Sequence, residues 1–301
     1  RYFDRITRPE QIIQSFPNAV QTMLDPADCG PACISLCQDI QGQTFDYPEE
    51  FFKERIHSIR RPRPDDFQIK EAAEKIKKSK NPIIISGGGI FYSNAMEELS
   101  NFAIKHNIPV TQTVMGYSTM KRDHSHYAGQ IGGLGGKNTN ELAKETDLAI
   151  AVGTKLADFT TGSWANFENE NFKLLSINVS RFDANKHLAQ AVVGDAKVSL
   201  IELSEALGDW KVGDEWNEKS QRELKIWNEH IDKESAPTNQ EVPSYIQVIG
   251  AIYRNSEPTD IAVTAAGGLV GEVVQVWRPK ELNTHESEWG FSCMSYEISG
   301  A

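Results

Sequence analysis

Residues 81–116 constrain the fold of this chain most strongly, because they predict a strand, a glycine turn, a helix and a second strand in direct succession. The isoleucine run at 83–85 is short and β-branched, which favours a strand buried on both faces. Glycines at 87–89 permit a tight turn, and Ser93 or Asn94 is expected to cap the helix. Strands joined through a helix are parallel, with a right-handed crossover.

The helix in this unit is expected to lie on the sheet. Its apolar residues recur at helical spacing and form one stripe, made of Ala95, Met96, Leu99, Phe102 and Ala103. Burying each large member contributes roughly 1.5 to 3 kcal/mol, so packing rather than propensity drives its formation. Asn107 is predicted to end the helix.

The same alternation continues along the chain and predicts a complete, doubly wound α/β domain over residues 66–208, with a Rossmann-like parallel sheet. Further strands are predicted at 147–153 and 172–179. The glycine-rich stretch 129–136 follows no clear strand and is predicted to be a loop, with Asn138 or Thr139 capping the next helix.

The flanking segments predict parts of other domains. Residues 1–45 are typical of the last helix and strand of an α/β domain, with Pro17 expected to kink or split the helix, and 46–65 of an extended linker. Residues 209–240 predict a linker with a surface helix, and 241–301 the start of a further α/β domain. We therefore expect the chain to be a piece of a longer protein.

Composition argues against several classes of partner. The net charge is -11 and no long basic block occurs, which argues against nucleic acid. No apolar run is long enough to span a bilayer and no signal peptide is recognisable, so a cytoplasmic protein without membrane contact is expected. Cys29, Cys33 and Cys37 lack zinc or iron-sulfur spacing and are expected to be buried thiols.

A nicotinamide site requires three glycines in frame and an acid after the next strand. Gly87 and Gly89 supply two of the glycines, but Tyr92 occupies the third position and residues 110–116 contain no acid. A tight structural turn is therefore favoured over a dinucleotide site.

Other polar clusters also favour structural interpretations. His124 and His126 are interpreted as exposed loop histidines rather than metal ligands or acid/base groups, and Glu286 and Glu288 as surface acids. The linker arginines Arg60, Arg61 and Arg63 favour a solvated or salt-bridged linker over a phosphate site.

Several segments together resemble the thiamine-diphosphate-dependent enzymes of the acetolactate synthase type. These segments occur in the same order as in that family. They are Gly30 with Pro31 and the strand that follows, the linker, the turn at 86–89, and residues 108–110, 147–156 and 193–196. A second set of segments is similar to the family branch that hydrolyses a trihydroxycyclohexane-dione in myo-inositol breakdown; these are residues 2–11, 158–164, 264–269 and 289–294.

This resemblance implies an α/β central domain flanked by partial thiamine-diphosphate-binding domains. The implied activity is hydrolysis of a carbon-carbon bond in a polyol-derived cyclic 1,2-diketone, giving 5-deoxy-glucuronate. The implied cofactors are thiamine diphosphate and Mg²⁺, FAD is not expected, and the assembly is a homodimer or homotetramer. Alternatives are an acetolactate synthase-like carboligase, an FAD- or NAD-binding module, and a structural domain that mediates assembly.

The resemblance also implies the site residues. The cofactor-binding positions are Ala266, Gly267, Gly268, Leu269, Ser292 and Met294. Met294 is implied as an apolar wedge against the cofactor, with a core methionine as the alternative, and Ser295 stands where the family has glycine. No catalytic residue or metal ligand is expected here, because the activating glutamate is expected upstream of Arg1 and the magnesium motif downstream of Ala301. The chain alone is expected to be inactive.

Overall fold

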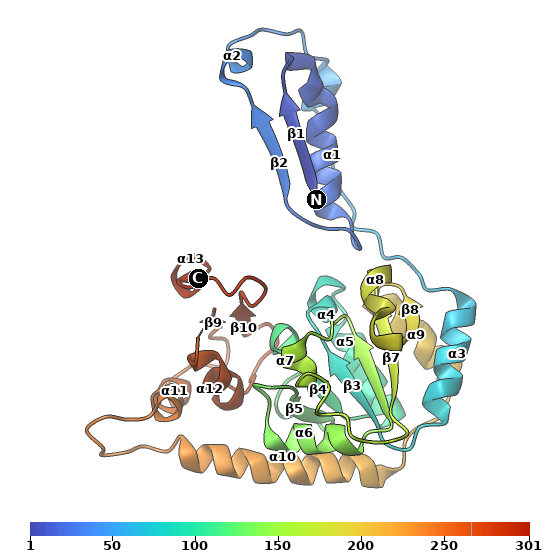
Figure 1. Cartoon of the computed structure of the whole chain (residues 1–301), viewed down its shortest axis with the longest axis vertical. Coiled ribbons are helices and arrows are strands. Elements are labelled where there is room, and N and C mark those ends of the chain that lie inside the picture. Colours follow the sequence, from blue (N-terminus) through green and yellow to red (C-terminus); the bar gives the residue numbers. More distant parts are fainter. Residues whose placement is uncertain (266) are drawn as a thin grey trace. The chain divides into compact units, whose positions relative to one another are not determined.

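The computed structural model describes residues 1–265 and 267–301, and it divides into two compact units, residues 1–62 and 63–301 (Figure 1).

The first unit is a single βαβ arrangement. Strand β1 (Tyr2–Ile6) is followed by the 3-10 turn η1 (Pro9–Gln11), helix α1 (Ile12–Leu24) and strand β2 (Ala32–Leu36), and the two strands pair in parallel. Short helical turns follow at α2 (Gln38–Gln41) and η2 (Glu49–Phe52). Helix α1 continues through Pro17, so the expected split of this helix is wrong.

The expectation that the three cysteines are buried is also wrong. Cys29 and Cys33 are exposed and Cys37 is half-buried. The physical reason is that α1 packs on one face of a sheet with only two strands, while Cys33 pairs in register with Phe3 on the other face. Phe3 is itself 69% exposed. Alternate residues of a strand point to opposite faces, so this second face lies open.

The second unit is built on a six-stranded, wholly parallel sheet in the order β5-β4-β3-β6-β7-β8, which confirms the doubly wound α/β fold. The strands are β3 (Pro82–Ser86), β4 (Val110–Gln112), β5 (Tyr127–Gln130), β6 (Leu148–Val152), β7 (Lys173–Asn178) and β8 (Gln190–Val193). Every residue of β3 and β6 is buried, as expected for central strands covered on both faces. The edge strands β5 and β8 were not predicted.

Helices cover both faces of this sheet (Figure 1). The layer formed by α3 (Asp66–Lys77), α5 (Met96–His106) and α9 (Ala196–Leu207) is held together by contacts of α3 and α5 with α9. Helix α6 (Lys137–Glu145) packs against α10 (Asp214–Glu234) in the other layer. Shorter helical segments are α4 (Gly89–Tyr92), η3 (Val114–Gly116), α7 (Asp158–Thr161), α8 (Arg181–Ala184) and η4 (Lys186–Leu188).

The ends of these helices correct two predictions. Asn107 ends α5 in a left-handed conformation, as predicted, but α5 begins after Ala95 without a side-chain cap. Helix α6 likewise begins after Gly136, because the side chains of Asn138 and Thr139 both donate to the carbonyl of Ala128 instead. These side chains anchor α6 to β5, which is why they do not cap the helix.

Helix α10 leads to a smaller group of elements that completes the second unit. They are α11 (Tyr245–Arg254), β9 (Ala262–Thr264), α12 (Leu269–Val276), β10 (His285–Ser287) and α13 (Tyr296–Ser299), and β9 pairs with β10 in parallel. Helix α10 buries Trp216, Leu224 and Ile231, so one face of it is core rather than surface. No helix among the described residues has the length and apolar content needed to cross a bilayer.

Candidate functional site

The glycine turn after β3 is packed shut by protein backbone. A Cβ atom added to Gly87 would lie 2.4 Å from the carbonyl oxygen of Gly153, and one on Gly89 would lie 2.6 Å from the Cα of Gly153. The amide of Gly89 donates to the carbonyl of Gly153 at 2.9 Å. Glycine is thus needed for contact between the turns after β3 and β6, in agreement with the prediction of a tight structural turn at residues 87–89.

The sequence-predicted cofactor residues lie instead at the carboxyl ends of β9 and β10. Gly267 has φ +100, and Gly268 immediately precedes α12. A Cβ atom on either glycine would meet no atom of the described residues within 4 Å. Steric contact with neighbouring protein atoms therefore does not account for glycine at these two positions. Leu269 begins α12 and is half exposed, while Ala266 lies outside the described residues. The carboxyl ends of parallel strands are where α/β proteins bind ligands.

A tight loop after β10 faces the same end of this small sheet. The Glu288 amide donates to the carbonyl of Thr264, and the Glu288 carboxylate accepts from the amides of Phe291 and Cys293 at 2.7 Å each. These hydrogen bonds lower the pKa of Glu288, and the one from the Cys293 amide has the largest effect. Glu286 is an exposed acid, as interpreted, but Glu288 fixes this loop and is not an ordinary surface acid.

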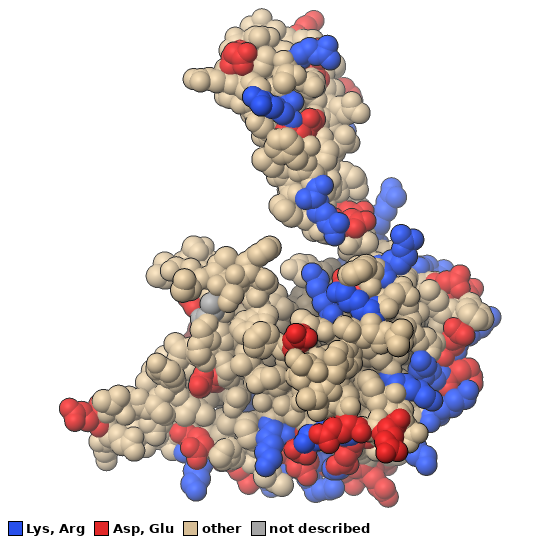
Figure 2. All heavy atoms as spheres, viewed as in Figure 1, with Lys and Arg blue, Asp and Glu red and all other residues tan. Residues whose placement is uncertain are grey.

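The loop presents apolar side chains outward. Met294 is 85% exposed and Phe291 89% exposed, so Met294 is not a core methionine. Ser292 and Ser295 both have left-handed backbones, at φ 54 and φ 74, the region in which glycine is unstrained. On the face in Figure 2, few charged side chains cover the end that carries α13. The exposed Met294 is therefore available to contact an apolar ring.

Tyr117 and Ser118, which sequence reasoning missed, attach this region to the large sheet. The buried Tyr117 hydroxyl lies 2.7 and 2.9 Å from the carbonyl oxygens of Val274 and Trp277, which share its single donor proton. Ser118 accepts a hydrogen bond from the amide of Thr284 at 3.2 Å. The only signal in the sequence is an aromatic residue placed after β4 in a polar stretch.

Two of the segments that carry the branch resemblance meet in space. Phe159, from the stretch 158–164, packs edge to face on Trp289, from 289–294, with ring centroids 5.1 Å apart. Beside them, burial lowers the pKa of His285 to about 4, and its ring bonds the Thr264 hydroxyl at 3.2 Å. His285 is therefore neutral at pH 7 and supports the base of the turn.

The interpretation of His124 and His126 as exposed loop residues is wrong. His126 is buried, with Nε2 bonded to Asn107 at 3.0 Å and Nδ1 to Ser125 at 2.9 Å, and His124 bonds Ser100 at 2.9 Å. Both rings fill polar sites between helix and loop, which the sequence spacing did not reveal. Among residues 1–265 and 267–301, no group of three or more His, Cys, Asp and Glu side chains is placed to hold a metal ion.

Two features of this region offer contacts to a ligand. The turn at Gly267 and Gly268 leaves open space, and α12 begins without a side-chain cap. Uncapped amides at a helix start favour negative charge, and the exposed Met294 offers an apolar surface. Thiamine diphosphate has both a ring and an anionic group.

Comparison with known proteins agrees with this fold. Residues 69–203 match the family model described as thiamine pyrophosphate enzyme, central domain. The chain is 38% identical to the 3D-(3,5/4)-trihydroxycyclohexane-1,2-dione hydrolase of Clostridium tetani, over 100% of this chain and 50% of the relative. Hydrolases of the same name match from Bacillus licheniformis, at 38% identity over 100% of this chain and 51% of the relative, and from Geobacillus thermodenitrificans, at 37% over 100% and 50%.

The chain therefore spans about half the length of the curated relatives it matches. Together with the six-stranded parallel sheet, these matches identify residues 69–203 as a thiamine pyrophosphate enzyme central domain, in a chain homologous along its whole length to the trihydroxycyclohexane-dione hydrolases.

Proposed function

We propose that this chain forms part of a thiamine-diphosphate-dependent hydrolase that opens a trihydroxycyclohexane-1,2-dione ring to 5-deoxy-glucuronate in myo-inositol breakdown. The observation that carries the proposal is the 38% identity to such a hydrolase along the entire chain. The match includes the segments around Gly268 and Met294 as well as the central domain, so it reaches the proposed site.

The cofactor, when bound, supplies a nucleophilic carbon and an electron sink for carbon-carbon cleavage. In the proposal, the backbone at Gly267 and Gly268 lies against it where a side chain would clash. The exposed Met294 packs on its ring, and the loop held by Glu288 fixes the direction of that side chain. Ala266, Leu269 and Ser292 are proposed to line the same cofactor site. Mg²⁺ and a homodimer or homotetramer are proposed on the resemblance alone.

The test uses the protein at its natural length with thiamine diphosphate and Mg²⁺. Ring opening of the trihydroxycyclohexane-dione is expected, measured as loss of the dione and appearance of the acid, without acetolactate formation from pyruvate. Acetolactate formation alone would show that the branch assignment is wrong and favour a carboligase. Calorimetry on the 301-residue chain alone is expected to show no tight, Mg²⁺-dependent binding of thiamine diphosphate.

A matched pair of glycine variants tests the site. Gly268 and Gly213 each precede a helix, and a Cβ on either meets nothing within 4 Å. In the natural-length protein, Gly268→Leu should weaken thiamine diphosphate binding at least about tenfold, since it fills the proposed cofactor space. Gly213→Leu should leave binding unchanged. Equal effects of the two variants would refute the proposed role of Gly268.

The nucleotide-module alternative is not favoured, because the contact of Gly87 and Gly89 with Gly153 fills the position where a dinucleotide would approach.

A further inference from the structure

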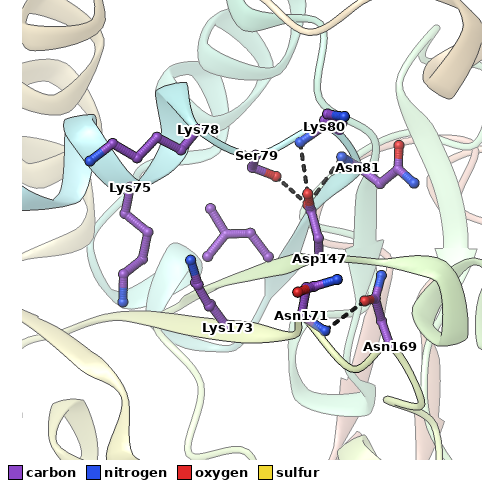
Figure 3. Close-up of a pocket in the computed structure, with 10 residues that line it drawn as sticks. Lys75, Lys78, Ser79, Lys80, Asn81, Asp147, Asn169, Asn171 and Lys173 are labelled. Atoms are coloured by element: carbon purple, nitrogen blue, oxygen red, sulfur yellow. Dashed lines mark hydrogen bonds between the residues drawn. The ribbon is translucent and has the colours of Figure 1, made fainter.

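A cavity of about 360 Å³ lies at the amino ends of the central strands (Figure 3). The glycine turns lie at the opposite, carboxyl ends of these strands. Asn81 and Asp147 immediately precede β3 and β6, and Lys173 begins β7. The last turn of α3 completes the wall. We call this space the basic cavity, and its lining residues are Lys75, Lys78, Ser79, Lys80, Asn81, Asp147, Leu148, Asn169, Asn171 and Lys173.

Four lysines line the basic cavity, and among the described residues their ammonium groups form no ion pair or hydrogen bond; the charge of Glu71 acts only on Lys75. Figure 3 shows Lys75 and Lys173 extending beside one another along one side of the space. Some other lysines in this unit are paired: Lys77 lies 3.8 Å from Glu74, and Lys144 lies 3.4 Å from both Glu141 and Glu168. The cluster is notable in a chain whose net charge is -11.

The one carboxylate in the lining, Asp147, offsets only one of the four lysine charges. Asp147 accepts hydrogen bonds from the Ser79 hydroxyl and from the backbone amides of Lys80 and Asn81, the last two at 2.8 and 3.1 Å (Figure 3). Its oxygens are thus used to join the start of β6 to the turn after α3. Four lysines and one aspartate leave the described lining with a formal net charge of +3.

Lys75 is the most enclosed of the four lysines. It is half-buried, and burial, followed by the charge of Lys173, lowers its pKa. Ammonium groups held close together in partly buried space repel each other, and an anion placed between them removes that repulsion.

We propose that the basic cavity binds a small anion carrying a diphosphate group. Lys75 and Lys173 bring two ammonium groups to one side of the space, and the amides of Asn81, Asn169 and Asn171 lie across from them (Figure 3). A compact ligand with several negative oxygens satisfies such a set best, because each oxygen accepts a charge-assisted hydrogen bond. Leu148 is the only apolar residue of the lining, so the recognised part is the anion rather than a large ring.

Titration calorimetry of the chain with inorganic pyrophosphate, at low salt and without magnesium, tests this. Saturable binding at a single site is expected. Lys75→Gln and Lys173→Gln should each weaken it about tenfold, corresponding to the loss of one charge-assisted hydrogen bond. Parallel titrations with ADP and with adenosine identify the source of the group: tighter binding of ADP than of pyrophosphate indicates a nucleotide, and the reverse indicates a free polyphosphate.

Two control variants make the result specific. Lys70→Gln removes the same charge from an exposed position of α3 that does not line the cavity, and it should leave binding unchanged. Gly268→Leu should also have no effect, which separates this site from the proposed cofactor site. Thermal unfolding checks that each variant folds. If Lys75→Gln does not fold, Lys173→Gln, at an exposed position, still tests the role of the cavity lysines. Absence of saturable binding, or equal weakening by Lys70→Gln, would overturn the proposal.

Discussion

The contact between Gly89 and Gly153 leaves no space for a side chain, so a substitution at Gly89 should lower the stability of the chain. Gly89→Ala should destabilise the chain by about 1 to 3 kcal/mol, because the new methyl would overlap backbone atoms that cannot rotate away. Gly213→Ala is the control, since a Cβ there meets nothing within 4 Å, and its effect should stay within about 0.5 kcal/mol. Urea unfolding followed by circular dichroism measures both; equal effects would contradict the packing argument.

His126 predicts a pH dependence of stability. Burial lowers its pKa from 6.5 to about 4 in the folded chain, so the neutral ring is the folded form. Its contribution is full above pH 6.5 and is lost as the pH falls toward 4, because the unfolded chain takes up the proton first. At about 1.4 kcal/mol per pH unit, the upper limit is about 3 kcal/mol.

Unfolding free energies of the wild type and His126→Gln at pH 7.5 and pH values near 4.5 measure this contribution. The variant should lose less stability on acidification, while some loss remains because burial also lowers the pKa of His285 to about 4. His230→Gln, at an exposed position of α10, should retain the wild-type dependence. An unchanged pH dependence in His126→Gln would count against a neutral buried ring.

At the scale of the element, α10 illustrates how burial distinguishes apolar residues on one helix. Leu224 is 6% exposed and Ile226 is 61% exposed. Leu224→Ala should cost about 2 to 5 kcal/mol, because it leaves a cavity against β5 and α6, whereas Ile226→Ala should change stability by less than about 0.5 kcal/mol. Chemical denaturation compares them, and a similar cost at both positions would mean that α10 does not pack as described.

Strongly periodic elements could be predicted from the sequence, while short edge elements could not. The isoleucine run of β3 and the apolar stripe of α5 can be recognised in the sequence, because burial on a sheet imposes those patterns. Strand β5 is only Tyr127–Gln130, and two of its residues, Gly129 and Gln130, are not typical of strands. It pairs because β4 lies beside it, and such tertiary information is absent from a local pattern.

At the scale of the whole unit, Tyr117 connects the large sheet to the elements around α12. Tyr117→Phe removes the hydroxyl bonded to the carbonyls of Val274 and Trp277 while it retains the buried ring. We expect a loss of about 1 to 3 kcal/mol, because the one donor proton shared by these two carbonyls is removed. Hydrogen exchange should quicken in α12 and stay unchanged in β3 and β6; uniform acceleration would indicate general destabilisation instead.

The candidate site was reached from the sequence through family resemblance rather than through local chemistry. Gly267 and Gly268 follow β9 in a pattern that many α/β turns share, and Met294 is indistinguishable from a core residue by spacing alone. The roles of Tyr117 and Glu288 depend on contacts between distant or irregular segments. Such contacts produce no periodic pattern in the sequence, so they cannot be predicted from it.

The open face of the two-stranded sheet in the first unit has a practical consequence. Phe3, on this face, is 69% exposed, Leu36 at the end of β2 is 51% exposed, and each strand has one edge unpaired among the described residues. Exposed apolar strands with unpaired edges promote association between chains. Light scattering should therefore show self-association of the 301-residue chain that grows with concentration and decreases in Phe3→Ser. Binding to this chain should therefore be measured at protein concentrations below those at which it associates.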